Sequence, residues 1–529
     1  MASDGNRSAL CNNSFQHGLF EQSGPLAIRR DQLMAAQMVD LSKVMEFLAI
    51  KESHARVLLM HHRWNVERVF DSLERKGLER LFAESGVPFV EDDVVRFNLD
   101  QLPTQHEGDR LSVMCTVCCE EVGAMEVTRM ECGHCFCNSC WTKHFIARID
   151  DGHASRIRCM AIHCNSICNY QTVRLLLSAW DPLVSARFDH LLMESYIDDN
   201  DLACWCPSNP PCGHAIRVGF RSDPYCEVEC VCEIQFCFNC LSNVHSPCTC
   251  YIWRMWVKRC EVEGQNTGWI EANTKVCPGC GNAVIKAGGC NHMTCRCGQT
   301  FCWLCGGPTS KSHGLEGHSC NSFTKAELMG PTSQDFFRYK HYYVRYRCHN
   351  DSLEMETLLK QSLQNKKCPL PFSLCPHPTD RPTRDENWVL VGIQKLLLSR
   401  RFLTYTYPFA FYMFGDFLAG NDLPNKDIRQ NLFEAQQQQL ECCVEKLAME
   451  LERDFDQVAP GEVADMRLRV IGLSSTLDNY CRNMYECIEE ELLPYLGQTA
   501  FIARYNSSGP DKATEISCVE GSSLIKCMK

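Results

Sequence analysis

The sequence predicts a multidomain protein that is mainly α-helical, with small α+β modules in its middle part. Three observations lead to this prediction. The chain has 529 residues, which is long for a single hydrophobic core. Of its 39 cysteines, 29 lie between Cys115 and Cys320. On both sides of that block, apolar residues recur at the spacing of helices that bury one face.

The composition narrows the class of protein. Hydrophobic residues make up 45% and charged residues 22%, as in ordinary globular domains. No signal peptide and no apolar stretch of membrane-spanning length is found, so we expect an intracellular protein of the cytoplasm or nucleus that binds no membrane. The formal net charge of −12 disfavours nucleic acid as a partner, because phosphates would be repelled.

The N-terminal part is expected to hold one small helical module. Residues 1–30 are polar and predicted to be disordered, and residues 86–110 form an acidic linker. Between them, residues 31–85 have the length and spacing of three helices. The predicted core consists of Val44, Phe47, Leu48, Ala55, Leu58, Leu59, Trp64, Val69 and Phe70.

The part after the cysteine-rich block, residues 323–500, is expected to form a helical bundle. A proline-rich stretch between Cys368 and Pro382 separates the first predicted helix from the second. The run Gln436–Gln439 is interpreted as a solvated helix face, and residues 501–529 as a flexible tail. The predicted helices are 339–364, 388–417, 432–455 and 464–495.

The last cysteine-rich module, residues 274–322, has one thiol more than its metal sites need. In a reducing compartment, C-x2-C pairs with histidine predict zinc ligands, four to a tetrahedral site. Cys290 is left over, after two glycines and two residues before His292, as expected of a nucleophile beside a candidate base. The two predicted sites are Cys277, Cys280, Cys295 and Cys297, and Cys302, Cys305, His313 and Cys320.

The first module, residues 111–168, resembles a RING zinc finger. A RING binds two interleaved zinc ions, each of which can contribute about 10 kcal/mol or more to folding. The resemblance implies one site from Cys115, Cys118, Cys137 and Cys140, and a second from Cys132, His134, Cys159 and Cys164.

The second module, residues 169–252, resembles the in-between-RING (IBR) zinc finger. Its eight ligands fall in consecutive fours, and the final position is open between Cys248 and Cys250. The resemblance favours Cys250, because that residue follows His245 by the expected gap. The two sites are then Cys206, Cys212, Cys230 and Cys232, and Cys237, Cys240, His245 and Cys250. Six zinc ions per chain are expected in all.

The order of these modules resembles the Ariadne family of RING-between-RING E3 ubiquitin ligases. The strings GGCNHM and FCWLC in the third module, and YTYPFAFYMF at residues 405–414, carry the resemblance together with the ligand spacing. Residues 31–85 are similar to the family's ubiquitin-associated (UBA)-like domain, residues 253–273 to its linker helix, and residues 323–500 to its Ariadne bundle.

The resemblance implies a mechanism and partners. A ubiquitin-conjugating enzyme (E2) would dock on residues 115–164 near Val117, and ubiquitin would pass to Cys290 as a thioester and then to a substrate lysine. His292 would act as general base. Glu356 matches an inhibitory contact that holds the catalytic module against the bundle. Neddylated cullin-RING ligases are possible partners.

One departure from the family leaves an alternative open. Ile285 stands five residues before Cys290, where the resemblance to active members of the family implies an acidic residue. An apolar side chain cannot orient an imidazole, so lysine transfer could be slowed. The chain could then be a catalytically weakened adaptor for E2 or cullin complexes. A nucleic-acid-binding zinc protein is a third reading, which the net acidity opposes.

Overall fold

The computed structural model describes residues 24–87, 112–219, 226–264, 274–286, 288–310, 318–323, 331–365, 388–415, 423–453, 458–497 and 500–515. They fall into two compact units. Unit 1 holds residues 1–224, 228–235 and 511–529, and unit 2 holds residues 225–227 and 236–510. Helices predominate and the sheets have two to four strands, which confirms the predicted fold class.

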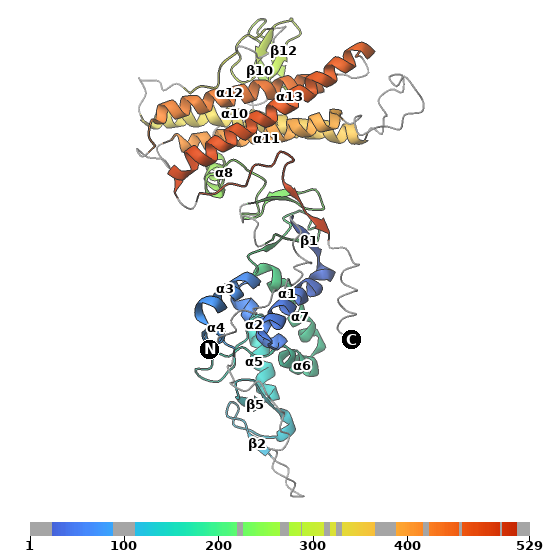
Figure 1. Cartoon of the computed structure of the whole chain (residues 1–529), viewed down its shortest axis with the longest axis vertical. Coiled ribbons are helices and arrows are strands. Elements are labelled where there is room, and N and C mark those ends of the chain that lie inside the picture. The colour runs from blue at the N-terminus through green and yellow to red at the C-terminus, as the bar shows by residue number, and fades with distance from the viewer. Residues whose placement is uncertain are drawn as a thin grey trace, which may run out of the picture. The chain divides into compact units, whose positions relative to one another are not determined.

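Unit 2 is dominated by four long helices that lie alongside one another, with the module of β10 and β12 on one side (Figure 1). The helices are α10 (Pro331–Asn365), α11 (Trp388–Met413), α12 (Lys426–Leu451) and α13 (Pro460–Glu486). A π-helical turn (Cys487–Leu492) and a 3-10 turn (Leu493–Leu496) follow α13. The predicted bundle is therefore present, with helix ends that differ by several residues from those expected.

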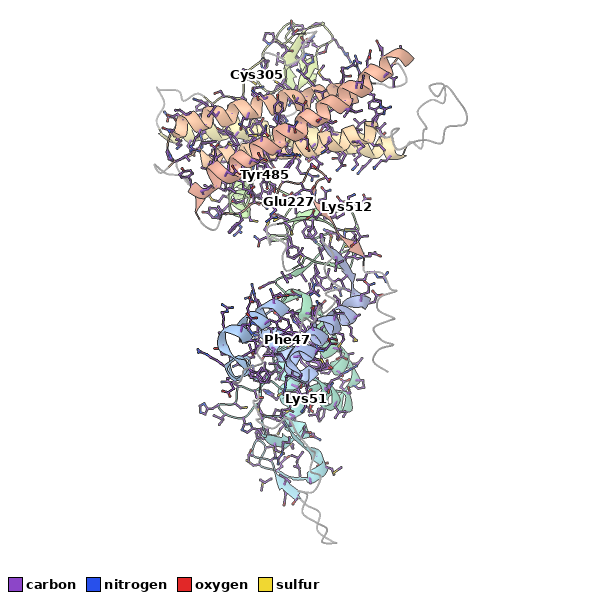
Figure 2. All side chains as sticks on the ribbon, in the orientation of Figure 1. Phe47, Lys51, Glu227, Cys305, Tyr485 and Lys512 are labelled. Carbon is purple, nitrogen blue, oxygen red and sulfur yellow. The ribbon has the colours of Figure 1, made fainter. Side chains whose placement is uncertain are left out.

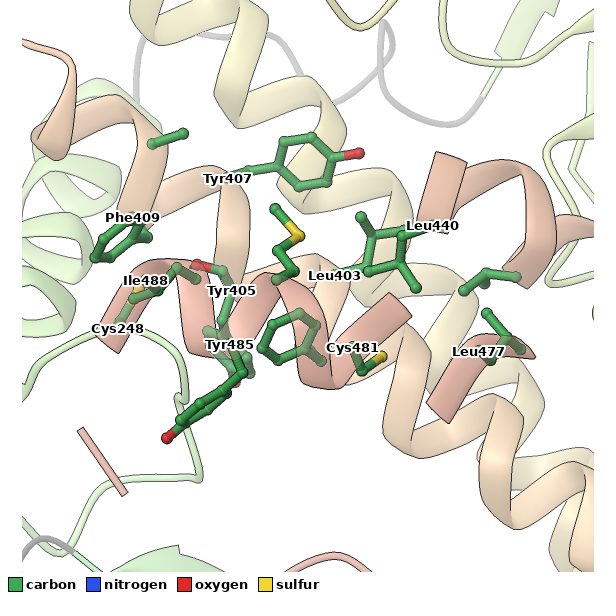
Figure 3. Packing of buried hydrophobic residues seen from close by; sticks show 14 of the residues in the cluster. Cys248, Leu403, Tyr405, Tyr407, Phe409, Leu440, Leu477, Cys481, Tyr485 and Ile488 are labelled. Atoms are coloured by element: carbon green, nitrogen blue, oxygen red, sulfur yellow. Dashed lines mark hydrogen bonds between the residues drawn. The ribbon is translucent and has the colours of Figure 1, made fainter. Parts of the chain in front are cut away.

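Helix α11 is the centre of this bundle. Every residue from Phe402 to Phe414 is buried, because its sequence is apolar on all sides rather than on one stripe. Side chains of α12 and α13 pack against those of α11. Leu403, Leu440 and Leu477, one from each helix, are fully buried there (Figure 3). The bundle is thus held by an ordinary hydrophobic core.

The cysteine-rich part of unit 2 has little core of its own. It contains the hairpins β10 (Thr274–Val276) with β11 (Ala283–Ile285) and β12 (His292–Thr294) with β13 (Thr300–Cys302). Strand β9 (Gln235–Cys237) and helix α8 (Cys250–Gly264) precede them. The predicted linker helix corresponds to α8, and its last predicted residues, 265–273, lie outside the described part. Cys305 lies in this module beside the bundle (Figure 2).

Unit 1 begins with four helices where the sequence predicted three. They are α1 (Leu33–Leu48), α2 (Glu52–His61), α3 (Val66–Lys76) and α4 (Leu78–Ser85). Asn65 begins α3 as its N-cap, with its side chain accepting from the Arg68 N–H. Six of the nine predicted core residues are buried, and Leu48 and Phe70 are partly buried. Phe47 is 64% exposed and packs on Phe70 at the surface (Figure 2).

The first zinc module of unit 1 is joined to a helical hairpin. The module contains β2 (Ser112–Met114), β3 (Glu121–Gly123), β4 (Val127–Arg129), β5 (Cys135–Cys137) and α5 (Asn138–Asp150). The hairpin consists of α6 (Tyr170–Trp180) and α7 (Pro182–Asp198). Asp181 caps α7 and is followed by Pro182 at the first helical position, which fixes the sharp turn between the two helices.

Both ends of the described chain pair with strands, so residues 26–29, 511–512 and 514–515 depart from the predicted disorder of residues 1–30 and the predicted flexible tail of residues 501–529. The remaining predictions for residues 1–23 and 516–529 lie outside the described residues. Strand β1 (Leu26–Arg29) lies between β15 (Thr514–Glu515) and β7 (His214–Arg217), and β6 (Ala203–Trp205) completes that sheet. Strand β14 (Asp511–Lys512) pairs with β8 (Glu227–Glu229). Pairing between distant segments orders these short polar stretches.

No helix in the described ranges combines the length and the apolar content needed to cross a bilayer.

A buried ion pair links the N-terminal helices to the rest of unit 1. The Asp40 carboxylate on α1 is fully buried and accepts from Arg217 Nη2 on β7 at 2.8 Å. The Tyr196 hydroxyl on α7 donates to the same carboxylate at 2.9 Å and accepts from Arg217 at 3.0 Å. All polar atoms of this contact between three elements therefore have partners, as burial requires.

We predict that Arg217→Met will destabilise unit 1 by about 3 kcal/mol, because the Asp40 carboxylate would remain buried without its cation. Arg63→Met is the matched control: Arg63 is 66% exposed in its pair with Asp201, and the change should cost about 1 kcal/mol or less. The measurement is hydrogen exchange of peptides from α1 and β7. Equal protection in the two variants would contradict the prediction.

Candidate zinc sites and reactive cysteine

Five groups of four side chains are arranged as tetrahedral metal sites. Within each group the ligand atoms lie within 4.8 Å of one another. They are the two predicted sites of the first module, the two of the second, and the site of Cys277, Cys280, Cys295 and Cys297. Each predicted ligand of these five sites is thus brought together with its three expected partners.

The spacing of the sulfur atoms fits zinc. The Sγ–Sγ distances are 3.9 Å for Cys118–Cys137, 3.6 Å for Cys206–Cys232 and 3.7 Å for Cys277–Cys297. Four thiolates at about 2.3 Å from a central Zn²⁺ would be about 3.8 Å apart. Bound zinc would supply structural cross-links between loops that have little apolar core.

A shared backbone turn points both cysteines at the same site in four of the five C-x2-C pairs, all but Cys137 and Cys140. The residue after the second cysteine has a positive φ, and its N–H bonds the carbonyl of the first cysteine at 2.8 to 3.0 Å. Two of the four positions are glycine, which has this conformation without strain. The four residues are Cys119, Leu241, Gly281 and Gly306.

The sixth site is only partly described. The Cys302 thiol contacts those of Cys305 and Cys320, and His318 Nε2 lies 3.2 Å from Cys305 Sγ. The predicted ligand His313 lies outside the described residues, so its role stays a prediction. His318 was not singled out from the sequence, although it lies two residues before Cys320.

The structure separates the roles of Cys248 and Cys250. Cys250 Sγ lies 3.7 Å from Cys237 Sγ in the metal-site group. The Cys248 thiol is fully buried and donates to the Tyr405 carbonyl of α11 at 3.1 Å. Burial raises the pKa of Cys248 well above its usual value, so this thiol is neutral and contributes to packing.

Cys290 belongs to none of the five groups and lies buried against α12. Its thiol points at the Glu445 carbonyl, with Sγ and O 3.8 Å apart, and the His292 N–H lies 3.3 Å from Sγ. Burial, with the nearby Glu445 carboxylate as the second cause, raises the pKa of Cys290 well above its usual value. In this arrangement the residue is a protonated, shielded thiol.

The Glu445 carboxylate joins the Cys290 loop to the bundle. It accepts from the Asn291 N–H at 2.5 Å and from Asn291 Nδ2 at 2.9 Å, and it forms an ion pair with Arg400 of α11. Arg400 also binds Glu356 of α10, with Nη2 and Oε1 2.6 Å apart. Burial alone would raise the pKa of Glu445, but Arg400, Lys286 and the Asn291 N–H hold it below its usual value.

Glu356, the predicted inhibitory residue, lies at the glycines before Cys290. Its side chain is 1% exposed. A Cβ added at Gly289 would lie 2.7 Å from Glu356 Oε1, so a larger residue than glycine would not fit against it. Glu356 is therefore not a solvated charge on the surface of its helix.

Lys286 supports the loop from the other side. Its ammonium donates to Asn291 Oδ1 and to the Ser352 hydroxyl of α10, both at 2.7 Å. Ser352 donates its own proton to the Cys348 carbonyl at 2.8 Å, so its oxygen is free to accept. Asn291 thus has a partner for each side-chain polar atom, and its amide orientation is fixed.

His292 is close to Cys290, but Ile285 is not positioned as a missing partner. The imidazole is hydrogen-bonded to the backbone of Ser310, and its buried Nε2 has no partner among the described residues. Burial lowers the pKa of His292, which favours the neutral ring. Ile285 is 69% exposed and pairs through its backbone with Thr274 of β10.

Glu434 of α12 also binds the C-terminal end of the cysteine-rich module, at residues 321–323. Glu434 of α12 accepts from the Ser322 hydroxyl and the Phe323 N–H, both at 3.1 Å, and from the Tyr342 hydroxyl at 2.8 Å. Asn321 Nδ2 donates to the Glu434 carbonyl at 3.0 Å. The run Gln436–Gln439 takes part: Gln437 is fully buried, which corrects the predicted solvated face.

Comparisons with known proteins give the same domain order. An Ariadne domain model matches residues 337–527, an IBR domain model residues 272–317, an IBR model described as a half RING-finger domain residues 186–250, and the UBA-like domain of E3 ubiquitin-protein ligase ARIH1 residues 35–72. The probable E3 ubiquitin-protein ligase ARI2 of Arabidopsis thaliana is 45% identical over 496 residues, covering 92% of this chain and 81% of that protein.

The chain belongs to the Ariadne family of RING-between-RING E3 ubiquitin-protein ligases. Human E3 ubiquitin-protein ligase ARIH1 is 29% identical over 485 residues, covering 87% of this chain and 81% of ARIH1. A solved structure of Pediculus humanus Parkin bound to phospho-ubiquitin matches with a TM-score of 0.18 and 22% identity, covering 40% of this chain and 73% of that one. The expected family is confirmed.

Sequence reasoning singled out Glu356 but missed the acidic residues of α12 and its C-cap that contact the cysteine-rich module. A signal was present, because Glu434, Glu441 and Glu445 of α12 and its C-cap residue Glu452 follow one another at helical spacings of seven, four and seven residues. Glu434, Glu441 and Glu445 are each at most 2% exposed. Acidic residues on the buried face of a helix need partners. Glu434 and Glu445 have partners in both the cysteine-rich module and the bundle, and the printed partners of Glu441 lie in the bundle.

We predict that His318→Ala will reduce the zinc content of the purified chain from about six ions to about five, because a tetrahedral site loses one of its four ligands. His313→Ala is the comparison, because the sequence alone predicted His313 as this ligand, and the placement of His318 beside Cys305 requires the His313 variant to keep all six. Metal analysis by mass spectrometry checks this. Loss of zinc in His313→Ala with retention in His318→Ala would contradict the geometric assignment.

Proposed function

We propose that this Ariadne ligase accepts ubiquitin from a conjugating enzyme as a thioester on Cys290 and transfers it to substrate lysines. The observation that carries the proposal is that Cys290 is a thiol outside the five named metal-site groups, with the His292 N–H facing its sulfur. Thiolates are the activated form for such a transfer. The zinc groups on either side of the loop supply rigidity, which aligns the reacting atoms.

Substrate aminolysis needs a base, and His292 is proposed for it. A lysine amine is mostly protonated near neutral pH and must lose its proton before or during attack. The His292 Nε2 atom has no hydrogen-bond partner among the described residues, and the bond to Ser310 fixes the ring. Ser310 could replace the orienting acid that is absent at Ile285.

The conjugating enzyme is proposed to dock on the first zinc module. Val117, between two ligands, is 50% exposed, and Ile162, between the last two ligands, is 86% exposed. Two apolar side chains exposed on a rigid zinc platform suit an apolar partner surface. Substrate proteins and neddylated cullin-RING ligases are further proposed partners, in the cytoplasm or nucleus.

The structure is proposed to be the resting form of the enzyme. Cys290 is 6% exposed, and Glu356, Glu445 and Glu452 of the bundle lie around its loop. A bulky thioester cannot reach a buried thiol, so the catalytic loop must leave the bundle first. A partner that binds the open form more tightly than the closed form would activate the enzyme.

The buried thiol and the apolar Ile285 also favour a second function, that of an adaptor which binds conjugating enzyme or cullin complexes without chemistry. Thioester formation separates the two functions. An adaptor would bind the charged conjugating enzyme but would never carry ubiquitin on Cys290, even when the loop is released.

We predict that Glu445→Ala with Glu452→Ala will raise thioester formation on Cys290 at least about tenfold in the full chain. Charge-assisted hydrogen bonds worth about 1.5–3 kcal/mol each would be lost from the closed form only. The assay is a non-reducing gel after mixing with ubiquitin-charged conjugating enzyme. Cys290→Ala should abolish the band, and Cys119→Ala should retain it. A band absent from the released chain would support the adaptor.

We predict that His292→Ala will slow discharge of ubiquitin to free lysine by about a hundredfold while leaving thioester formation intact, because only the second step removes a proton from an amine. Ile285→Glu should speed discharge if an orienting acid is limiting. Single-turnover discharge is compared across wild type and both variants. Equal rates in all three would refute the general-base role of His292.

A further inference from the structure

Three consecutive backbone N–H groups around Cys290 each bind a carboxylate. The Gly289 N–H donates to Glu452 Oε1 at 2.6 Å, and the Cys290 N–H donates to the same oxygen at 3.2 Å. The Asn291 N–H donates to Glu445 Oε2 at 2.5 Å. Successive N–H groups that face one side of a turn form a concave anion site.

The N–H groups of Gly289 and Cys290 converge on one oxygen atom of Glu452, beside the proposed nucleophile. Stabilisation of a tetrahedral oxyanion needs this arrangement, with donors about 2.7–3.1 Å from the oxygen. Asn291 Nδ2 adds a side-chain donor to the same loop, at 2.9 Å from Glu445 Oε1. Next in sequence, the His292 N–H faces the sulfur instead, at 3.3 Å.

We propose that the N–H groups of Gly289 and Cys290, with the side-chain amide of Asn291, form the oxyanion hole for ubiquitin transfer. In the resting chain the carboxylates of Glu452 and Glu445 occupy it. This inference rests on the proposed thioester function of Cys290. It assigns a second effect to the bundle: besides covering the sulfur, it places anionic oxygens where the reaction would develop negative charge.

The chemistry needs no further reactant. Cys290 loses its proton to solvent, and the thiolate forms a bond from Sγ to the thioester carbonyl carbon of the charged conjugating enzyme. The carbonyl oxygen becomes an oxyanion and accepts from the Gly289 and Cys290 N–H groups. When the tetrahedral intermediate collapses, the bond to the conjugating enzyme's sulfur breaks, and that thiolate leaves and takes a proton from solvent.

Lys286 is a positioning residue in this account. An ammonium group can only donate, so the Asn291 atom that faces Lys286 must be Oδ1, and Nδ2 is the atom left to donate, here to Glu445 Oε1. The Lys286–Asn291 bond lies within the catalytic module. It therefore persists when Glu445 and Ser352 of the bundle withdraw, and the Trp303 N–H still holds the Asn291 carbonyl at 2.8 Å.

Two reactions of the same sulfur test the proposal in the full chain that carries Glu445→Ala and Glu452→Ala. Acyl transfer from charged conjugating enzyme passes through an oxyanion, whereas alkylation by iodoacetamide does not. Gly289→Pro removes one N–H donor, and Gly289→Ala adds a side chain but keeps it. We expect acyl transfer to be about a hundredfold slower in Gly289→Pro than in Gly289→Ala, with alkylation rates within about threefold.

Equal acyl-transfer rates in the two Gly289 variants would overturn the proposal. If Gly289→Pro loses zinc or slows alkylation as much as acyl transfer, Asn291→Leu decides. That variant removes the side-chain donor, and a slowing of acyl transfer by about tenfold with unchanged alkylation supports the hole. The proposed oxyanion hole is refuted if Asn291→Leu slows both acyl transfer and alkylation, or neither of them. A parent double variant that forms no thioester at all would instead refute the proposed function.

Discussion

The organisation of unit 2 depends on the Glu445 carboxylate, which binds the catalytic loop through Asn291 and the bundle through Arg400. A carboxylate that is 1% exposed is stable only when its hydrogen bonds and charge are satisfied. Arg400 belongs to the bundle, whereas Asn291 belongs to the catalytic module. Separation of the two would leave Glu445 with part of its partners and return Cys290 to solvent.

Two different forces hold the two sides of this contact. The bundle has a hydrophobic core around α11, and the catalytic module depends on metal sites whose ligands come from short hairpins. The contact between them has a polar part, in which Lys286 bonds Ser352 and Asn291 bonds Glu445. It also has an apolar part, in which Val344 and Cys348 of α10 pack against the cluster around Trp303. A contact between two separately stabilised parts can open without unfolding either, as a regulated enzyme needs.

The sequence predicted those features that depend on local spacing. Zinc ligands are predictable because tetrahedral sites use cysteine pairs in tight turns. The bundle is predictable because α12 and α13 keep apolar periodicity and α11 is a long apolar segment. Pairing of β1 with β15 was not predictable, since it joins segments from opposite ends of the chain and neither has a strong pattern alone. Phe47 has core-like spacing but lies at the surface, because helical periodicity does not say where a face ends.

The central claim is that the Glu445 carboxylate keeps Cys290 shielded. The most direct measurement is the rate at which iodoacetamide alkylates Cys290 in the otherwise unmodified chain, followed by peptide mass spectrometry. Glu445→Gln is compared with Glu450→Gln, a change on the same helix at a surface ion pair with Arg469. We expect Cys290 to be alkylated at least about tenfold faster in Glu445→Gln than in Glu450→Gln, because charge-assisted hydrogen bonds of about 1.5–3 kcal/mol are lost. Equal rates in the two variants would contradict it.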